Sequence, residues 1–190
     1  MSRAREGEWP TLAYALLAVL ARGETTGYQL ARFMEKPVGL FWQAPHSQIY
    51  PQLAALERDG MITSSAARGP GPRARKTYAV TDAGRALLRD WVTTRPEPRA
   101  VRDEVVLRSY AAWIADRAEA AALFRAEQEA HEQRLAELEQ MAENLSAKHG
   151  ARLSDPSQPI FGNWAALQRG LGAEREYVRW CTWMAEQLDQ

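Results

Sequence analysis

The clearest indication of the fold comes from residues 45–80, PHSQIYPQLAALERDGMITSSAARGPGPRARKTYAV. The first part of this stretch has apolar residues at helical spacing and stops at Gly60, so it predicts one helix. Two strand-like segments follow, residues 61–66 and 76–80, separated by a tip rich in glycine and proline. No acidic residue occurs from Ile62 to Thr81. A helix that leads into a basic hairpin is typical of a winged helix-turn-helix, in which the helix enters the major groove of DNA and the hairpin contacts phosphates.

The predicted DNA-contacting residues form two groups. The first lies near the amino terminus of the predicted helix, where contacts to the groove concentrate. Its members are Ser47, Gln48, Tyr50 and Gln52. The second group consists of the cations of the hairpin, which can neutralise phosphates. Its members are Arg68, Arg73, Arg75 and Lys76.

Each group also has a purely structural interpretation. The basic residues can keep the edge of the hairpin from pairing with other chains. In this interpretation Ser47 is a helix cap and nothing more. The glutamines are ordinary surface residues, and the Tyr50 ring packs on the core. The combination of the helix with an acid-free basic hairpin favours the DNA interface.

The segments on either side of this stretch complete the domain. Apolar residues at helical spacing predict helices over residues 10–22 and 83–95, the second capped at Thr81. Thr26 and Gln29 match a capping box, which predicts that a further helix begins there. The residues of that helix that we expect to point inward are Leu30, Phe33 and Met34.

A proline-rich break separates this domain from the rest of the chain. Pro96 and Pro98 mark a linker at residues 96–100. We therefore expect a winged helix-turn-helix domain over residues 1–95 and a helical dimerisation domain over residues 101–190. The second domain is expected to hold helices over residues 101–114, 116–148 and 164–188, with a loop at 155–162. The predicted fold class is mainly α.

A seam of apolar residues on the long helix predicts a dimer contact. Its members follow one another at spacings of three and four, as in a coiled coil. The predicted dimerisation residues are Leu135, Leu138, Leu145, Trp180 and Trp183. Four tryptophans can be interpreted in two ways. They either line a ligand pocket or, as is commoner at helical spacing, form core or dimer contacts. They are Trp113, Trp164, Trp180 and Trp183.

The charges balance over the 190-residue chain but are divided unevenly along it. Residues 1–98 carry thirteen basic and nine acidic side chains, net +4, whereas residues 99–190 carry eleven and fifteen, net −4. This division suits a DNA-binding domain attached to a domain that stays off DNA. The single cysteine, Cys181, excludes an internal disulfide. The longest apolar run, residues 12–21, is too short to span a bilayer, so we expect a cytoplasmic protein without membrane contact.

Patterns of catalytic or metal-binding residues are missing from the sequence. The three histidines are scattered, with no cluster of carboxylates or thiols beside them. There is no P-loop and no nucleophile elbow. We expect no cofactor, no metal and no enzymatic activity.

Two segments of the chain point to a family. SQIYPQLAALERDGMI, which follows GYQL, and the later RARKTYAVTDAGRALL closely resemble the PadR family of bacterial transcriptional regulators. The carboxy-terminal half resembles the virulence-regulator-like helical domain of the larger PadR subfamily. The resemblance implies a dimeric repressor that binds inverted repeats in double-stranded promoter DNA, and many members respond to a small-molecule effector. It also places Ser47, Gln48 and Tyr50 on the base-reading helix and the hairpin cations on phosphates.

Two alternatives stay open at this point. A winged helix can serve as a protein–protein interaction module without DNA binding, although such a module has no need of an acid-free hairpin. A MarR-like regulator is the second alternative. Such chains place dimerisation helices on both sides of the winged helix, whereas here only about ten residues precede the first predicted helix.

Overall fold

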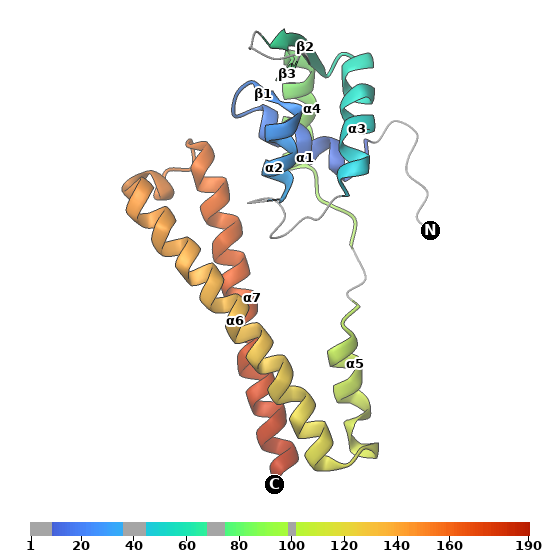
Figure 1. Cartoon of the computed structure of the whole chain (residues 1–190), viewed down its shortest axis with the longest axis vertical. Coiled ribbons are helices and arrows are strands. Elements are labelled where there is room, and N and C mark those ends of the chain that lie inside the picture. The colour runs from blue at the N-terminus through green and yellow to red at the C-terminus, as the bar shows by residue number, and fades with distance from the viewer. Residues whose placement is uncertain (1–8, 36–44, 68–74, 99–101) are drawn as a thin grey trace. The chain divides into compact units, whose positions relative to one another are not determined.

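The computed structural model describes residues 9–35, 45–67, 75–98 and 102–190. The chain divides into two compact units, Met1–Glu97 and Pro98–Gln190 (Figure 1). We call them unit 1 and unit 2 and describe each by itself.

Unit 1 is a winged helix-turn-helix. Its elements in chain order are α1 (Thr11–Leu20), β1 (Thr25–Thr26), α2 (Gly27–Glu35), α3 (His46–Arg58), β2 (Ile62–Ala67), β3 (Arg75–Val80) and α4 (Asp82–Thr93). The three strands form one antiparallel sheet in the order β1-β3-β2. The predicted fold class is thereby confirmed. Strand β1 was not predicted, because two residues are too few to show a strand pattern.

The core of unit 1 lies between its helices and the sheet. Helix α3 buries Ile49, Leu53 and Leu56 on one face, as its spacing predicts. The other fully buried large side chains are Leu16, Leu17 and Leu20 of α1, Leu30 of α2 and Ile62 of β2. Removing each such side chain from water contributes roughly 1.5–3 kcal/mol before the loss of chain entropy is counted.

Helix α2 begins as the sequence predicts but packs differently. The backbone N–H of Gln29 donates to Thr26 Oγ1 at 3.2 Å, and the N–H of Thr26 donates to Gln29 Oε1 at 3.1 Å. The predicted capping box is therefore present. The inward position predicted for Phe33 is wrong, because its side chain is 38 % exposed while Leu30 and Met34 are buried.

The root of the hairpin is held by a tight contact with α4. The carbonyl oxygen of Met61 accepts the backbone N–H of Thr81 at 3.1 Å. The Thr81 hydroxyl lies 2.8 Å from the Gly60 carbonyl oxygen and accepts the N–H of Gly84 at 3.1 Å, so Thr81 caps α4. A Cβ atom on Gly84 would lie 2.1 Å from the Met61 oxygen. Only glycine fits there.

Unit 2 consists of helices. They are α5 (Glu104–Ala111), η2 (Ala112–Ile114), α6 (Arg117–His149), η3 (Gly150–Ser154) and α7 (Pro159–Asp189). The two long helices, α6 and α7, run side by side in opposite directions (Figure 1). Phe124 of α6 and Leu171 and Cys181 of α7 are buried between the helices of this unit.

The boundaries of the unit 2 helices correct two predictions. Helix α7 begins at Pro159, within the stretch expected to be a loop. A proline is tolerated in the first turn of a helix because the N–H groups there have no helical acceptor. The first predicted helix of this unit ends earlier than expected, at Ala111, and one 3₁₀ turn follows it.

Gly84→Ala tests the contact at the hairpin root. We expect it to lower the free energy of unfolding by about 2 kcal/mol or more, because overpacking against backbone outweighs the gain in helix propensity. Gly172→Ala is the matched control, since a Cβ there meets nothing within 4 Å inside α7, and it should be neutral or stabilising. Urea denaturation followed by circular dichroism measures both. A Gly84→Ala protein as stable as the wild type would show that α4 can move away from Met61.

Candidate DNA-binding surface and helical hairpin

The predicted base-reading residues of α3 lie outside the face that packs into the core. Ser47, Gln48 and Tyr50 are exposed and Gln52 is half-buried. Pro51, Ala54 and Arg58 of α3 are exposed as well, so the predicted residues form part of the surface that the helix offers to a partner. Their role in DNA binding stays a prediction.

Proline shapes the start of α3. The N-cap residue is Pro45, and the N–H of Gln48 donates to its carbonyl oxygen at 2.9 Å. Ser47 therefore lies inside the first turn, and the interpretation of it as the helix cap is wrong. Pro51 lies within the helix and has no N–H. The Ser47 carbonyl consequently lacks its usual helical donor at the end of α3 where groove contacts are predicted.

Tyr50 lies against the beginning of α2. A Cβ atom on Gly27 would be 3.0 Å from Cε1 of Tyr50 and 3.5 Å from Cε2 of Tyr78. The Tyr50 side chain is still 52 % exposed. Its ring is thus held on one side by α2, while the rest is available at the surface. Both interpretations of Tyr50, structural and DNA-contacting, are compatible with this placement.

The hairpin cations are only partly described. Arg68 and Arg73 lie outside the described residues, and for Arg75 the structure gives the backbone alone, in β3 opposite Ala67. Lys76 is exposed, and its Nζ lies 3.4 Å from Oε2 of Glu57 on α3. The predicted phosphate-binding lysine therefore has a carboxylate beside it within the chain.

Glu57 is a residue of this surface that the sequence did not reveal. Its Oε1 accepts a hydrogen bond from the hydroxyl of Ser64 on β2. This bond, together with the neighbouring Lys76 ammonium, lowers the pKa of Glu57 against a partial desolvation that acts in the opposite direction. The one available signal was that Glu57 is the sole acidic residue in a helix predicted to face DNA.

The predicted dimer seam on α6 faces α7 of the same chain. His131 Nδ1 contacts Oε2 of Glu174, and a Cβ atom on Gly170 would lie 3.3 Å from Cδ1 of Leu138. Leu135, Leu138 and Leu145 are half-buried. The seam thus has an intramolecular partner at two points along its length. Whether its leucines also contact a second chain stays a prediction.

The four tryptophans do not line one pocket. Trp180 is half-buried, with its ring centroid 5.6 Å from that of Phe124 and 5.4 Å from that of Tyr177. Trp183 is exposed. Trp164 lies sixteen residues before Trp180 on the same helix, about 24 Å away along its axis. Trp113 is exposed on η2.

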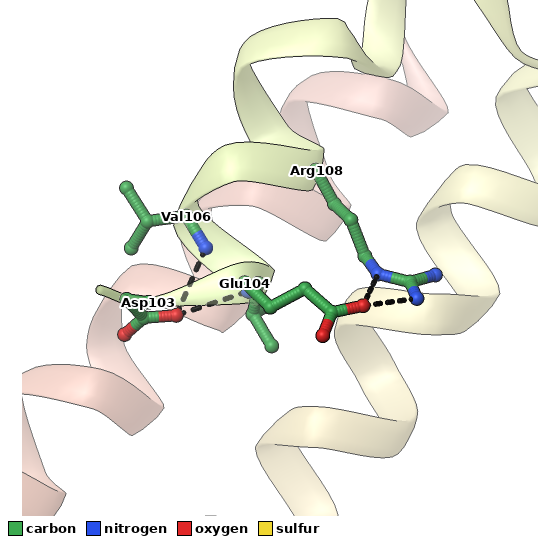
Figure 2. A network of polar contacts seen from close by, with 5 residues as sticks. Asp103, Glu104, Val106 and Arg108 are labelled. Atoms are coloured by element: carbon green, nitrogen blue, oxygen red, sulfur yellow. Dashed lines mark hydrogen bonds and ion pairs between the residues drawn. The ribbon is translucent and has the colours of Figure 1, made fainter.

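Asp103 fastens the start of α5 to α7. Its Oδ1 accepts the N–H groups of Val105 at 3.0 Å and Val106 at 3.1 Å, as a helix cap, and Figure 2 shows this cap beside the ion pair of Glu104 with Arg108. The hydroxyl of Tyr177 donates to the same carboxylate at 3.0 Å. Burial and the Asp103 carboxylate raise the pKa of Tyr177, so the hydroxyl stays protonated.

Tyr177 and Cys181 occupy neighbouring turns of α7. The Tyr177 ring stacks on the imidazole of His131, with centroids 3.9 Å apart, and so connects α6 with α7. Cys181 is fully buried. Burial, with the nearby carboxylates of Glu127 and Asp103, raises the pKa of the Cys181 thiol to about 11. The thiol is therefore a core group without nucleophilic character.

The described part of unit 2 leaves an apolar surface of α5 and η2 exposed. None of the described residues of these two elements is buried. The exposed apolar side chains are Val106, Leu107, Tyr110, Trp113 and Ile114. They recur at helical spacing, so they form one face, which we call the α5 face.

Two absences concern the part of the chain that the structure describes. There, no group of three or more His, Cys, Asp or Glu side chains could hold a metal ion. Within the same ranges, no helix has both the length and the apolar character needed to cross a bilayer.

Two family models match the chain, one for each unit. Residues 16–90 match the transcriptional regulator PadR-like family, and residues 101–189 match the carboxy-terminal domain of virulence activator alpha. The negative transcriptional regulator PadR of Bacillus subtilis is 34% identical over 180 residues, which is 94% of this chain and 98% of the relative.

Solved structures of that Bacillus subtilis protein are similar to this chain over nearly its whole length. The crystal structure with operator DNA has a TM-score of 0.86 at 33% identity and covers 94% of this chain and 99% of its own. The crystal structure with p-coumaric acid has a TM-score of 0.81 at 34% identity and covers 95% of this chain and 100% of its own.

Tyr177→Phe tests the link between α5 and α7. The change removes one hydrogen bond to a carboxylate, so the free energy of unfolding should fall by about 1–2 kcal/mol. Tyr110→Phe is the control, because that side chain is 84 % exposed on α5 and the same atom is removed. Urea denaturation of both variants decides the matter. An equal effect of the two changes would mean that the Asp103 contact contributes nothing.

Proposed function

The chain belongs to the PadR-like family of transcriptional regulators, and we propose that it is a repressor that binds a two-fold symmetric operator as a homodimer. The observation that carries this proposal is the exposed face of α3, with Ser47, Gln48 and Tyr50 beside a hairpin whose sequence is basic. The relative crystallised with operator DNA supports it. Repression is supported by the name of the same relative, a negative regulator.

The residues in the interface have separate tasks. Gln48 and Gln52 are suited to read adenine through two hydrogen bonds each, and Ser47 to contact either a base or a phosphate. Tyr50 contributes its exposed edge. The hairpin cations Arg68, Arg73, Arg75 and Lys76 neutralise phosphates, which supplies affinity but no sequence discrimination.

A homodimer is required by the operator that we propose. Two-fold symmetric DNA sites are matched by two-fold symmetric proteins, each subunit reading one half-site. The α5 face is the surface best suited to the contact, because it is apolar and the described residues of unit 2 leave it exposed. Trp183 and the α6 leucines are the second candidates, although the leucine seam already faces α7.

An effector and a cellular location complete the proposal. We infer that a small aromatic acid releases the protein from DNA, on the basis of the relative crystallised with p-coumaric acid. p-Coumarate is therefore the first compound to add to the protein–DNA complex. We place the protein in the cytoplasm, with the DNA it regulates, and assign it no catalytic activity.

Selection of DNA from a random-sequence library tests the function. The wild-type protein should enrich duplexes with an inverted repeat and bind them in a fluorescence anisotropy titration. Gln48→Ala should lose roughly 1–3 kcal/mol of binding free energy on the selected duplex and little on a random duplex. Equal losses on both would mean that Gln48 only positions the protein. If the wild type enriches no sequence, the protein-interaction alternative replaces this proposal.

Leu107→Glu tests the α5 face as the dimer contact. A charge in the centre of an apolar interface should weaken dimerisation at least about tenfold. Val92→Glu is the matched control, since Leu107 and Val92 are both 67% exposed and Val92 lies on α4 of unit 1. Sedimentation equilibrium gives the dissociation constants, and circular dichroism checks that the helices persist. Unchanged dimerisation of Leu107→Glu would move the contact elsewhere.

A further inference from the structure

Glu57 is an acidic residue in a helix proposed to face a polyanion. It is the only carboxylate in the sequence of α3 and lies one residue before the end of that helix. Its side chain is 33% exposed, so its charge is not removed by deep burial. An unpaired negative charge near phosphates opposes DNA binding. The position therefore requires a compensating role.

The Glu57 carboxylate contacts both strands of the hairpin. Oε1 accepts the Ser64 hydroxyl of β2, and Oε2 lies 3.4 Å from Lys76 Nζ of β3. Ser64 lies opposite Tyr78 and Lys76 opposite Ala66, so Ser64 and Lys76 are diagonal neighbours on one face of the ladder. That face also carries Ile62 and Tyr78, which are buried in the core. One side chain of α3 thus spans the two strands just beyond the core.

The electrostatics of the group keep it intact at neutral pH. The Ser64 hydrogen bond and Lys76 lower the pKa of Glu57, so the carboxylate is ionised. The ammonium of Lys76 offsets the charge that would otherwise repel phosphates. Lys76 is therefore already engaged by Glu57 on the side of α3.

We propose that Glu57 is a positioning residue that fixes the hairpin relative to α3, and that Lys76 serves DNA binding through this contact rather than through a phosphate. This inference rests on the proposed function and refines it, since it removes Lys76 from the phosphate-binding cations. It also explains why an acid is present at a surface that electrostatics alone would keep free of acids.

The proposal predicts that Glu57→Gln changes the affinity for DNA in the opposite direction from that expected for the removal of a negative charge. Glu57→Gln takes a negative charge from the DNA side of the protein, which by charge alone should tighten binding. If Glu57 positions the hairpin, the same change should weaken binding by about three- to tenfold. It should also lower the slope of log affinity against log salt by about one unit for each hairpin phosphate contact that is lost.

The experiment measures the affinity of four proteins for the selected duplex at several salt concentrations. They are the wild type, Glu57→Gln, Lys76→Gln and the double variant. Asp59→Asn is the matched control. It removes the same charge two residues after Glu57, from a side chain that pairs with Arg58 and with no described residue of the hairpin. Thermal unfolding of each variant confirms that it is folded. Lys76 is 58% exposed, so Lys76→Gln keeps the test available even if Glu57→Gln is unstable.

Equal losses in the two single variants, with no further loss in the double variant, support the positioning role. Asp59→Asn should bind as tightly as the wild type or more tightly. Tighter binding by Glu57→Gln, or losses that add in the double variant, overturn the proposal, the second because Lys76 then acts independently on DNA. A wild-type protein that binds no DNA is a different result: it removes the proposed function itself.

Discussion

The close approach of α4 to the carbonyl oxygen of Met61 is the contact on which the geometry of unit 1 depends. Met61 connects the end of α3 to β2, and its own N–H donates to the Leu56 carbonyl oxygen at 2.8 Å. Its oxygen is held by Thr81, at the end of β3, and is met by Gly84. The end of α3, strands β2 and β3 and the start of α4 therefore converge on one peptide group, so a shift of one of them moves the others.

The hairpin is attached to the body of unit 1 at two places. Its root is fixed by the Met61 and Thr81 backbone contact, and its middle by the side chain of Glu57. A hairpin held only at its root is free to swing about that root, because a small rotation there becomes a large displacement at the tip. A second attachment limits this rotation. The sequence tip between the strands can then be rich in glycine and proline without loss of direction in the strands themselves.

The predictions that held were those that depend on neighbours in the sequence. The capping box at Thr26, the cap at Thr81 and the apolar face of α3 are all decided within one or two helical turns. Predictions that depend on packing failed or were missed. Phe33 fits the periodicity of α2 but lies at the margin of the buried face, and the contact of Glu57 with Ser64 exists only because the chain folds back seven residues later.

The same distinction holds in unit 2. A heptad-like spacing identifies the apolar seam of α6 but not the helix that covers it, and the structure supplies α7 of the same chain. The α5 face could not be recognised from its sequence, because exposed and buried amphipathic helices have the same pattern. Which side chains meet is therefore a property of the tertiary arrangement, even where every helix is predicted.

The thiol of Cys181, the one cysteine in the sequence, can report on local opening of unit 2. Because the sulfur is fully buried and poorly ionised, a thiol-directed reagent in solution can reach it only when α7 separates from its neighbours. No other cysteine in the chain competes for the reagent. When reclosing is faster than labelling, the rate of labelling equals the equilibrium constant for opening multiplied by the labelling rate of an exposed thiol. When labelling is faster than reclosing, it equals the rate of opening itself. Thiol labelling therefore measures the opening of unit 2 without an introduced probe and without a signal from unit 1.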